Sequence, residues 1–309
     1  MALSDNVANL TVSNDGSGDF AGYLTPEQSE AIFEKAAQTS VVQRLARQIT
    51  LGPSGKNIPV FTGDVTADWV SETGEKPITK GAVGLRNIQP HKIAAIFVAS
   101  AEVVRANPAN YMQVMRSKVA EAFAKAFDAA ALHGVNSPFG TDNYIGATTK
   151  TQEFGTNTYL DINNGLAQLV NDGYTLEGFA FDVKAEPVIN ASVDNAGRPL
   201  WVDAPYAEAS VMLRPGRMLG RPAFVGKGVA NDATNTLGFA GDWSQAVWGV
   251  VGGISYDVTD QATLPIGDNN AMVSLWQRNL VAVRAEAEFG FLVNDPEAFV
   301  EFTGEYAGS

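Results

Sequence analysis

The sequence predicts an α+β protein, and three observations lead to this prediction. Two long stretches rich in Val, Ile, Phe and Thr, Asn57–Glu72 and Ala82–Ser100, indicate a β-hairpin. A long amphipathic pattern follows and indicates one helix of unusual length. Short helical and strand patterns then alternate between residues 158 and 268, before a regularly alternating strand near the C-terminus.

The hairpin is too polar to be a self-sufficient element. Residues 74–81, which connect its strands, are mostly charged, polar or Gly. Two strands without a covering layer are marginal in water, so we expect a second copy of the chain to supply the missing surface. Apolar side chains on such an arm are typical of subunit contacts, although Trp69 could instead pack onto its own domain. The expected contact residues are Trp69, Val70, Glu72, Glu75, Lys76, Ile78, Lys80 and Arg86 on the arm, and Arg116 on the long helix.

The helix after the hairpin has clear start and stop signals. Asn107 is a suitable N-cap, Pro108 suits the first helical position, and Gly134 suits the end. The helix would have about 26 residues and a length of about 39 Å. Apolar residues recur at steps of three and four, namely Tyr111, Met112, Met115, Val119, Phe123, Ala126, Phe127 and Ala130. The polar residues Arg116, Lys118, Glu121, Lys125 and Asp128 are expected to face elsewhere.

The other elements are shorter. Before the hairpin, Thr25-Pro26-Glu27-Gln28 begins a helix that we expect to reach about Arg47. Further helices are expected at Asp161–Asn171 and, interrupted near Pro187, at Lys184–Val193. Strands are expected at Gly178–Phe181, Ala209–Leu213, Pro222–Val225, Trp243–Val251 and Ile254–Val258. The closing strand places Val281, Val283, Ala285, Ala287 and Phe289 on one face, and Ala298–Phe302 is expected to return beside it, under the long helix.

Composition narrows the functional classes. The 309 residues include 34 acidic and 21 basic side chains, a net charge of −13, which argues against tight binding to DNA phosphates. The absence of cysteine excludes disulfides and thiolate metal sites. No apolar stretch is long enough to span a membrane, and no signal peptide is evident, so we expect a cytoplasmic protein.

Enzyme signatures are absent from the sequence. His91 and His133 are far apart and are expected to be structural, and no metal or cofactor is expected. The run Gly16-Ser17-Gly18-Asp19-Phe20-Ala21 satisfies a loose dinucleotide pattern, but no strong strand precedes it and no helix opens directly after it.

Three segments then suggest a family. They are Ala67–Pro77 in the hairpin, the Asn107-Pro108 helix start, and the closing run Gln277–Glu286. In this order they resemble the major capsid proteins of tailed bacteriophages with the Hong Kong 97 fold, over nearly the whole chain. The resemblance implies an N-terminal arm and helix (1–54), an extended E-loop hairpin (55–100), a peripheral (P) domain in two parts (101–157 with the spine helix, and 269–309), and an inserted axial (A) domain (158–268).

The resemblance also implies partners. Such subunits assemble into hexamers and pentamers of an icosahedral virion capsid, inside the host bacterial cytoplasm. The shell encloses double-stranded DNA without sequence-specific binding and involves no membrane. Because only residues 1–54 precede the hairpin, a scaffold is expected to be a separate protein. A portal is a further expected partner, and a decoration protein an optional one.

The resemblance suggests one reaction. Some family members join an E-loop lysine to a P-domain asparagine of a neighbour, assisted by a glutamate, and Lys76, Asn279 and Glu286 stand at the matching positions. The reaction needs a neutral amine and a base. An alternative stays open, in which Lys76 is solvated, Asn279 is a turn residue and Glu286 pairs with Arg284 or another cation. Asn279 and Glu286 would also lie on opposite faces of a strand, unless Asn279 precedes it or a bulge intervenes.

Two other functions remain open at this point. An encapsulin, the shell of a cellular compartment that holds a cargo enzyme, shares the same fold. From a different class, a carbohydrate-active α/β protein would use Trp201, Trp243 and Trp248 together with the many acidic residues.

Overall fold

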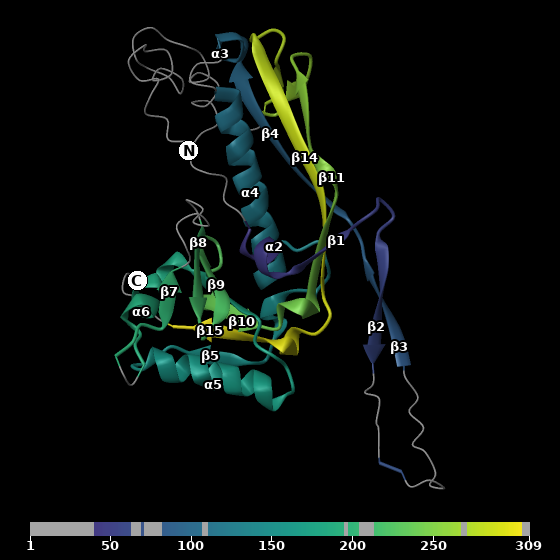
Figure 1. Cartoon of the computed structure of the whole chain (residues 1–309). Helices are drawn as coiled ribbons and strands as arrows, with labels where there is room; N and C mark the ends of the chain where they lie inside the picture. The colour runs from purple at the N-terminus through teal and green to yellow at the C-terminus, as the bar shows by residue number, and fades with distance from the viewer. Residues whose placement is uncertain are drawn as a thin grey trace.

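The computed structural model describes residues 40–62, 69–70, 82–106, 111–194, 197–203, 213–266 and 271–304. In Figure 1, a long helix lies along a long narrow sheet, a second sheet forms a more compact body, and a two-stranded hairpin projects away from both. None of the described helices is both long and apolar enough to cross a membrane.

The spine helix α4 (Tyr111–His133) confirms the predicted long helix. It ends where expected, because Gly134 has a positive φ of 66° that side-chain-bearing residues rarely adopt. Its predicted start at Asn107 and Pro108 lies outside the described residues. A short helix, α3 (Ala101–Ala106), precedes it.

The long sheet has four strands in the order β1 (Arg47–Thr50), β11 (Ala246–Thr259), β14 (Leu280–Val293) and β4 (His91–Ser100). Only β1 and β11 are parallel. Helix α4 covers one face, where Val119 and Phe123 pack against Ala285 and Ala287. Residues on the opposite face of β4 are exposed, including Ile96 at 53 %. The middle of the sheet therefore has a core on the α4 side only, whereas small buried clusters around Leu280 and Leu292 cover the two ends of the other face.

The predicted strand Ala82–Ser100 is wrong as a single element. It consists of β3 (Ala82–Ile88), which pairs with β2 (Lys56–Thr62), and of β4, which pairs with β14. The break follows Ile88, which is buried with Leu51 and Leu292. This burial fixes the point where the chain leaves the hairpin and enters the long sheet.

The second sheet has seven strands and is covered on both faces. One face packs against α5 (Thr158–Asn171), so closely that a Cβ on Gly165 would lie 2.8 Å from the Phe302 ring. The other face packs against α2 (Val41–Leu45) and the last turns of α4. The strand order is β5 (Thr151–Glu153), β15 (Phe299–Thr303), β10 (Thr236–Gly241), β6 (Gly178–Asp182), β9 (Arg221–Gly226), β8 (Leu213–Met218) and β7 (Trp201–Asp203).

Two expected pairings differ from those in the structure. The final strand β15 does not return beside β14, because the 3₁₀ turn η8 (Pro296–Ala298) directs it into the seven-stranded sheet next to β10. The two strands expected at Trp243–Val251 and Ile254–Val258 are one strand, β11, which has an irregularity between Val251 and Ser255. It follows the 3₁₀ turn η6 (Trp243–Gln245) and joins the long sheet.

Several helix boundaries also differ. The helix expected to reach Arg47 ends at Leu45, because Ala46 is extended and β1 begins at Arg47. Its expected start lies outside the described residues. Pro187 stands in the first turn of α6 (Glu186–Ala191) and therefore begins this helix rather than interrupting it. The remaining short elements are η3 (Ile145–Ala147), η4 (Val183–Ala185), β12 (Thr263–Leu264) and β13 (Val273–Ser274). Of the expected strand Ala209–Leu213, only Leu213 is described, and it begins β8.

Candidate subunit interface and cross-linking site

The hairpin β2–β3 is the candidate contact arm. Among the described strands it pairs with no other sheet, and Figure 1 shows it extending away from the body. Leu85 on β3 is 70 % exposed, and Arg86 is exposed beside it. Trp69 is fully exposed and Val70 is 41 % exposed, so Trp69 does not pack onto the described part of its own chain. The other expected arm residues, Glu72, Glu75, Lys76, Ile78 and Lys80, lie outside the described residues.

The root of the arm is held firmly. Ile88 is 1 % exposed and packs with Leu51 and Leu292, at the edge of the long sheet. Burying one such aliphatic side chain contributes about 1.5–3 kcal/mol. The arm is therefore anchored where it begins and exposes apolar surface farther out.

Arg116 contacts its own chain. Its guanidinium lies over the ring of Tyr256 on β11, 5.3 Å from the ring centroid. The side chain is otherwise exposed on α4. Its expected role in a subunit contact stays a prediction.

Asn279 is a turn residue immediately before β14. Its φ of 54° lies in the left-handed region, which Asn tolerates better than most residues. Its carbonyl accepts a hydrogen bond from the Ala101 N–H at 2.9 Å, which ties the turn to the start of α3. Because Asn279 precedes the strand, the alternation of faces along β14 does not govern its direction.

Glu286 belongs to an ion-pair ladder on the open face of the long sheet. Its carboxylate lies 3.4 Å from Lys92 Nζ on β4 and 3.5 Å from Arg284 on its own strand. Arg284 continues the ladder to Asp257 on β11 at 2.7 Å, and this hydrogen bond raises the pKa of Arg284. The pairing of Glu286 with Arg284, offered by the sequence as the alternative, is therefore present.

One chain does not bring the cross-linking residues together. Asn279 and Glu286 are seven residues apart along an extended segment, and a rise of ~3.3 Å per residue separates their Cα atoms by about 23 Å. Lys76 lies outside the described residues. A site that combines all three side chains therefore has to draw Asn279 and Glu286 from different subunits.

Sequence reasoning placed Asp128 wrongly on the polar face of the spine helix. Asp128 is 1 % exposed and accepts hydrogen bonds from the Ser40 hydroxyl and, at 3.1 Å, from the Val41 N–H. Burial raises its pKa from 3.8 to about 7, although these hydrogen bonds act in the opposite direction. Its carboxylate thus caps α2 and holds it against α4. Only the tertiary partner at Ser40, 88 residues away, reveals this role.

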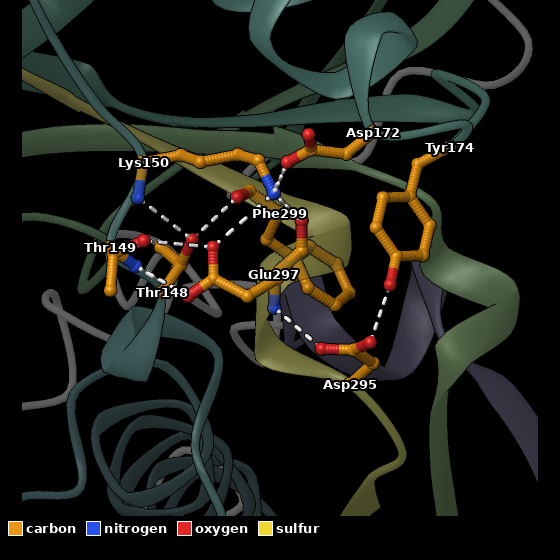
Figure 2. A network of polar contacts seen from close by, with 8 residues as sticks. All are labelled: Thr148, Thr149, Lys150, Asp172, Tyr174, Asp295, Glu297 and Phe299. Carbon is orange, nitrogen blue, oxygen red and sulfur yellow. Dashed lines mark hydrogen bonds and ion pairs between the residues drawn. The ribbon is translucent and has the colours of Figure 1, made fainter.

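A second buried charge is Lys150, shown in Figure 2. Its amine lies 2.7 Å from Asp172 and 3.2 Å from the Glu297 carboxylate, and its side chain is only 8 % exposed. Burial alone would lower the pKa of Lys150, but the hydrogen bonds to the two carboxylates outweigh it and raise the pKa. Thr149 donates two hydrogen bonds to Glu297, both of 2.9 Å.

The same cluster includes a tyrosine. Tyr174 donates a hydrogen bond to Asp295, which raises the pKa of Tyr174 to about 12. The ring of Tyr174 also faces the Lys150 amine, 5.4 Å away. These contacts join the end of α5, the approach to β5 and η8, so the cluster fixes the turn that redirects β15 (Figure 2). No local pattern in the sequence indicates this cluster of polar side chains.

The tryptophans and histidines singled out in the sequence have structural environments. Trp201, Trp243 and Trp248 are at most 8 % exposed, so they cannot form the platform that a carbohydrate-binding site needs. His133 is part-buried, contacts the Val229 carbonyl at 2.8 Å, and burial lowers its pKa. His91 packs edge-on against Phe139. Within the described ranges, no group of three or more His, Asp or Glu side chains could hold a metal ion.

Comparison with known proteins shows the family. The sequence profile described as "Phage capsid family" matches residues 21–304. The "Probable major capsid protein gp17" of Mycobacterium phage D29 is 49 % identical over 310 residues, covering 98 % of this chain and 96 % of that protein. The protein of the same name from Mycobacterium phage L5 is 47 % identical over 305 residues, covering 94 % and 92 %.

Solved structures agree with this relationship. A chain from Gordonia phage Cozz superposes with a TM-score of 0.67 and is 25 % identical, with 94 % of this chain and 95 % of that chain covered. The fold predicted from the resemblance is thereby confirmed. From the profile match and the two relatives, we conclude that this chain belongs to the phage capsid family.

Proposed function

We propose that the protein is the major capsid protein of a tailed phage, the subunit of an icosahedral shell that encloses double-stranded DNA. Its family and its 49 % identical relative support this function, which is structural rather than enzymatic. The observation that carries the proposal is the β2–β3 arm, whose Trp69 and Leu85 side chains are uncovered by the described part of their own chain. Neighbouring copies would cover them.

The described elements suit a subunit that packs beside other copies in a shell. The β2–β3 arm corresponds to the E-loop, α4 with the long sheet to the P domain, and the seven-stranded sheet to the A domain. The sequence-based boundaries 55–100, 101–157, 158–268 and 269–309 remain a proposal, and this assignment would shift them, because β4 and β11 belong to the long sheet while β5 and β15 belong to the seven-stranded sheet. In this arrangement the arm of one subunit lies on the P domain of the next, within hexamers and pentamers.

The proposed partners are those that the capsid function implies. A net charge of −13 favours a shell that encloses DNA without binding it tightly. A scaffold, if one is used, would be a separate protein, a portal completes the shell in the host bacterial cytoplasm, and a decoration protein is compatible with the same subunit. In this proposal the mature protein is located in the virion capsid.

Expression of the full chain alone in bacteria tests the function. We expect closed shells in electron micrographs and rapid sedimentation. A compact monomer at every concentration would contradict the proposal. Nuclease-protected DNA inside particles isolated from infected cells separates a phage capsid from an encapsulin, because an encapsulin would instead retain a cargo protein.

We further propose a trans-subunit cross-link as a finer feature of this shell. The neutral amine of Lys76 attacks the side-chain carboxamide carbon of Asn279 on a neighbour. An N–C bond forms, the bond to the amide nitrogen breaks, and ammonia leaves. Glu286 takes the proton from the attacking amine and passes it to the leaving nitrogen. The separation along β14 assigns Glu286 and Asn279 to different subunits.

Denaturing gel electrophoresis of mature particles tests whether the cross-link forms. We expect covalent ladders in the wild type and a monomer band alone in Asn279→Asp. Lys92→Met is the matched control, because it changes the ion-pair ladder without removing a reacting group. A monomer band alone in the wild type eliminates the cross-link and leaves the capsid function intact.

A further inference from the structure

The two strands of the projecting arm have different outer edges. Among the described strands, β2 and β3 pair only with each other, so each has one edge that faces away from the hairpin. Along an antiparallel pair, residues alternate. One residue exchanges both of its backbone hydrogen bonds with its partner, and the next points its N–H and C=O outward. A single proline indicates which residues point outward on each strand.

Pro59 fixes this alternation. It lies directly opposite Leu85. Because proline has no N–H, this pair cannot exchange two backbone hydrogen bonds, so the peptide groups of Pro59 and Leu85 point outward. Asn57 and Asn87 are opposite each other two positions away and share this arrangement. The Asn87 side chain donates a 2.6 Å hydrogen bond to the Asn57 side chain, which agrees, because side chains lie closer in pairs of this kind.

The outer edge of β2 is blocked. Its outward-pointing residues are Asn57, Pro59 and Phe61, and the central one has no N–H to donate. Lys56, at the start of the strand, adds an exposed charge. Proline and lysine are residues with which proteins prevent an edge strand from pairing with another chain. The β2 edge is therefore unsuited to receive a further strand.

The outer edge of β3 lacks this protection. Its outward-pointing residues Val83, Leu85 and Asn87 all carry an N–H, and β3 contains neither proline nor lysine. Its one charged residue, Arg86, belongs to the alternate set that bonds to β2. Leu85 is 70 % exposed at the centre of this edge. An edge with unpaired backbone groups and an exposed apolar side chain is a template for one more strand.

We propose that the outer edge of β3 pairs with an extended segment of a second copy of this chain, so that the arm gains a third strand. This proposal rests on the proposed shell function and names the edge of the arm that receives the neighbour. A second copy is the partner because the hairpin projects away from the body of its own chain, and shell assembly places identical chains beside it (Figure 1). Main-chain hydrogen bonds supply the affinity in such strand addition.

Amide hydrogen exchange of the full-length protein tests this pairing directly. In subunits kept below the assembly concentration, the N–H groups of Leu85 and Asn87 should exchange at least ~10-fold faster than those of Gly84 and Arg86, which bond to β2. In assembled shells, Leu85 and Asn87 should slow to the rates of Gly84 and Arg86. Slow exchange of Leu85 before assembly would show that its own chain covers the edge. Fast exchange of Leu85 in shells would show that no strand pairs with it. Either result would overturn the proposal.

Substitutions at position 85 separate backbone pairing from side-chain contact. Leu85→Ala keeps the outward N–H, whereas Leu85→Pro removes it at a position where the opposite strand already holds Pro59. Leu85→Pro should raise the protein concentration needed for shell formation at least ~5-fold above that of Leu85→Ala, because a carbonyl of the neighbour loses its donor. Asn57→Pro, on the blocked edge of β2, is the matched control and should leave this concentration unchanged. Light scattering measures all three variants.

The outcomes separate this proposal from the capsid function. Equal assembly concentrations for Leu85→Pro and Leu85→Ala, or an equal rise in Asn57→Pro, would overturn the strand pairing. Wild-type shells in which the Leu85 amide stays unprotected would reject the pairing while the capsid function stands. A wild-type protein that forms no shells at any concentration would contradict the capsid function and, with it, this proposal.

Discussion

The two sheets differ in how completely they are packed. The seven-stranded sheet has apolar side chains on both faces, with Phe302 and Phe239 fully buried. The long sheet has α4 on one face and an open face that carries Ile96 and the ladder around Glu286. The first region completes its core within one chain, whereas the second leaves surface for contacts. Stability and assembly therefore depend on different residues.

Breaking the two-sided core should have the largest effect. Phe302→Ala removes a ring that stacks on Phe154 at 5.2 Å and packs on Gly165. We expect the free energy of unfolding to fall by about 3–5 kcal/mol. Urea denaturation of the unassembled subunit measures it. Ile96→Ala on the open face is the control and should change the value by less than about 0.5 kcal/mol. Equal losses in both variants would contradict the comparison.

The joint between the two regions should respond to pH. Burial raises the pKa of Asp128 to about 7, so the folded protein keeps a proton between about pH 4 and 7 that the unfolded chain has released. Stability from this group is therefore highest at low pH and falls as pH rises through 7. We expect a loss of about 2–3 kcal/mol between pH 5 and 8.

Asp128→Asn isolates this contribution. The amide cannot ionise, so the difference in unfolding free energy between the wild type and the variant should change by about 2–3 kcal/mol over the same pH range. Other titrating groups are common to both proteins and cancel in this difference. If the unfolding free energies of the wild type and of Asp128→Asn changed in parallel with pH, the prediction would be wrong, and Asp128 would be solvated or its charge compensated.

Two lysines sharpen the comparison between buried and exposed charge. Lys150→Met leaves Glu297 and Asp172 without their cation and should cost about 1–3 kcal/mol. Lys92→Met removes a pair on the open face, where the lysine side chain is 55 % exposed, and should cost about 0–1 kcal/mol. Urea titrations at low salt and at ~1 M salt measure both, and salt should abolish only the effect of Lys92. A larger loss of unfolding free energy in Lys92→Met than in Lys150→Met would contradict the prediction that the buried lysine contributes more.

The arm should show the smallest effect on the single subunit. Trp69 is fully exposed, so Trp69→Ala should change the unfolding free energy by less than about 0.5 kcal/mol. Loss of an aromatic anchor from an interface commonly costs about 2 kcal/mol or more in association, so shell formation should require a clearly higher protein concentration. Light scattering against concentration measures this threshold. An unchanged threshold would exclude Trp69 from the contacts.

Elements with local signals could be predicted from the amino-acid sequence. Gly134 ends the spine helix because its backbone adopts a positive φ. The helix expected at Asp161–Asn171 is α5, although the Asn157 side chain, which accepts a hydrogen bond from the Leu160 N–H, lets it begin three residues earlier, at Thr158. The alternation of apolar and polar residues along β14 correctly predicted that Ala285 and Ala287 lie on one face of the strand and Arg284 on the other. The family resemblance rested on such short segments, and the comparisons confirmed it.

The strand pairings and the partners of buried charges could not be predicted in this way. Whether β15 lies beside β14 or β10, and whether Asp128 faces water or Ser40, depends on chain segments that are distant in sequence. Local periodicity describes which face of an element is apolar, but it does not say which other element covers that face. The cost of burying polar groups selects among the possible arrangements, because a buried carboxylate or amine is stable only where a distant partner supplies its hydrogen bonds.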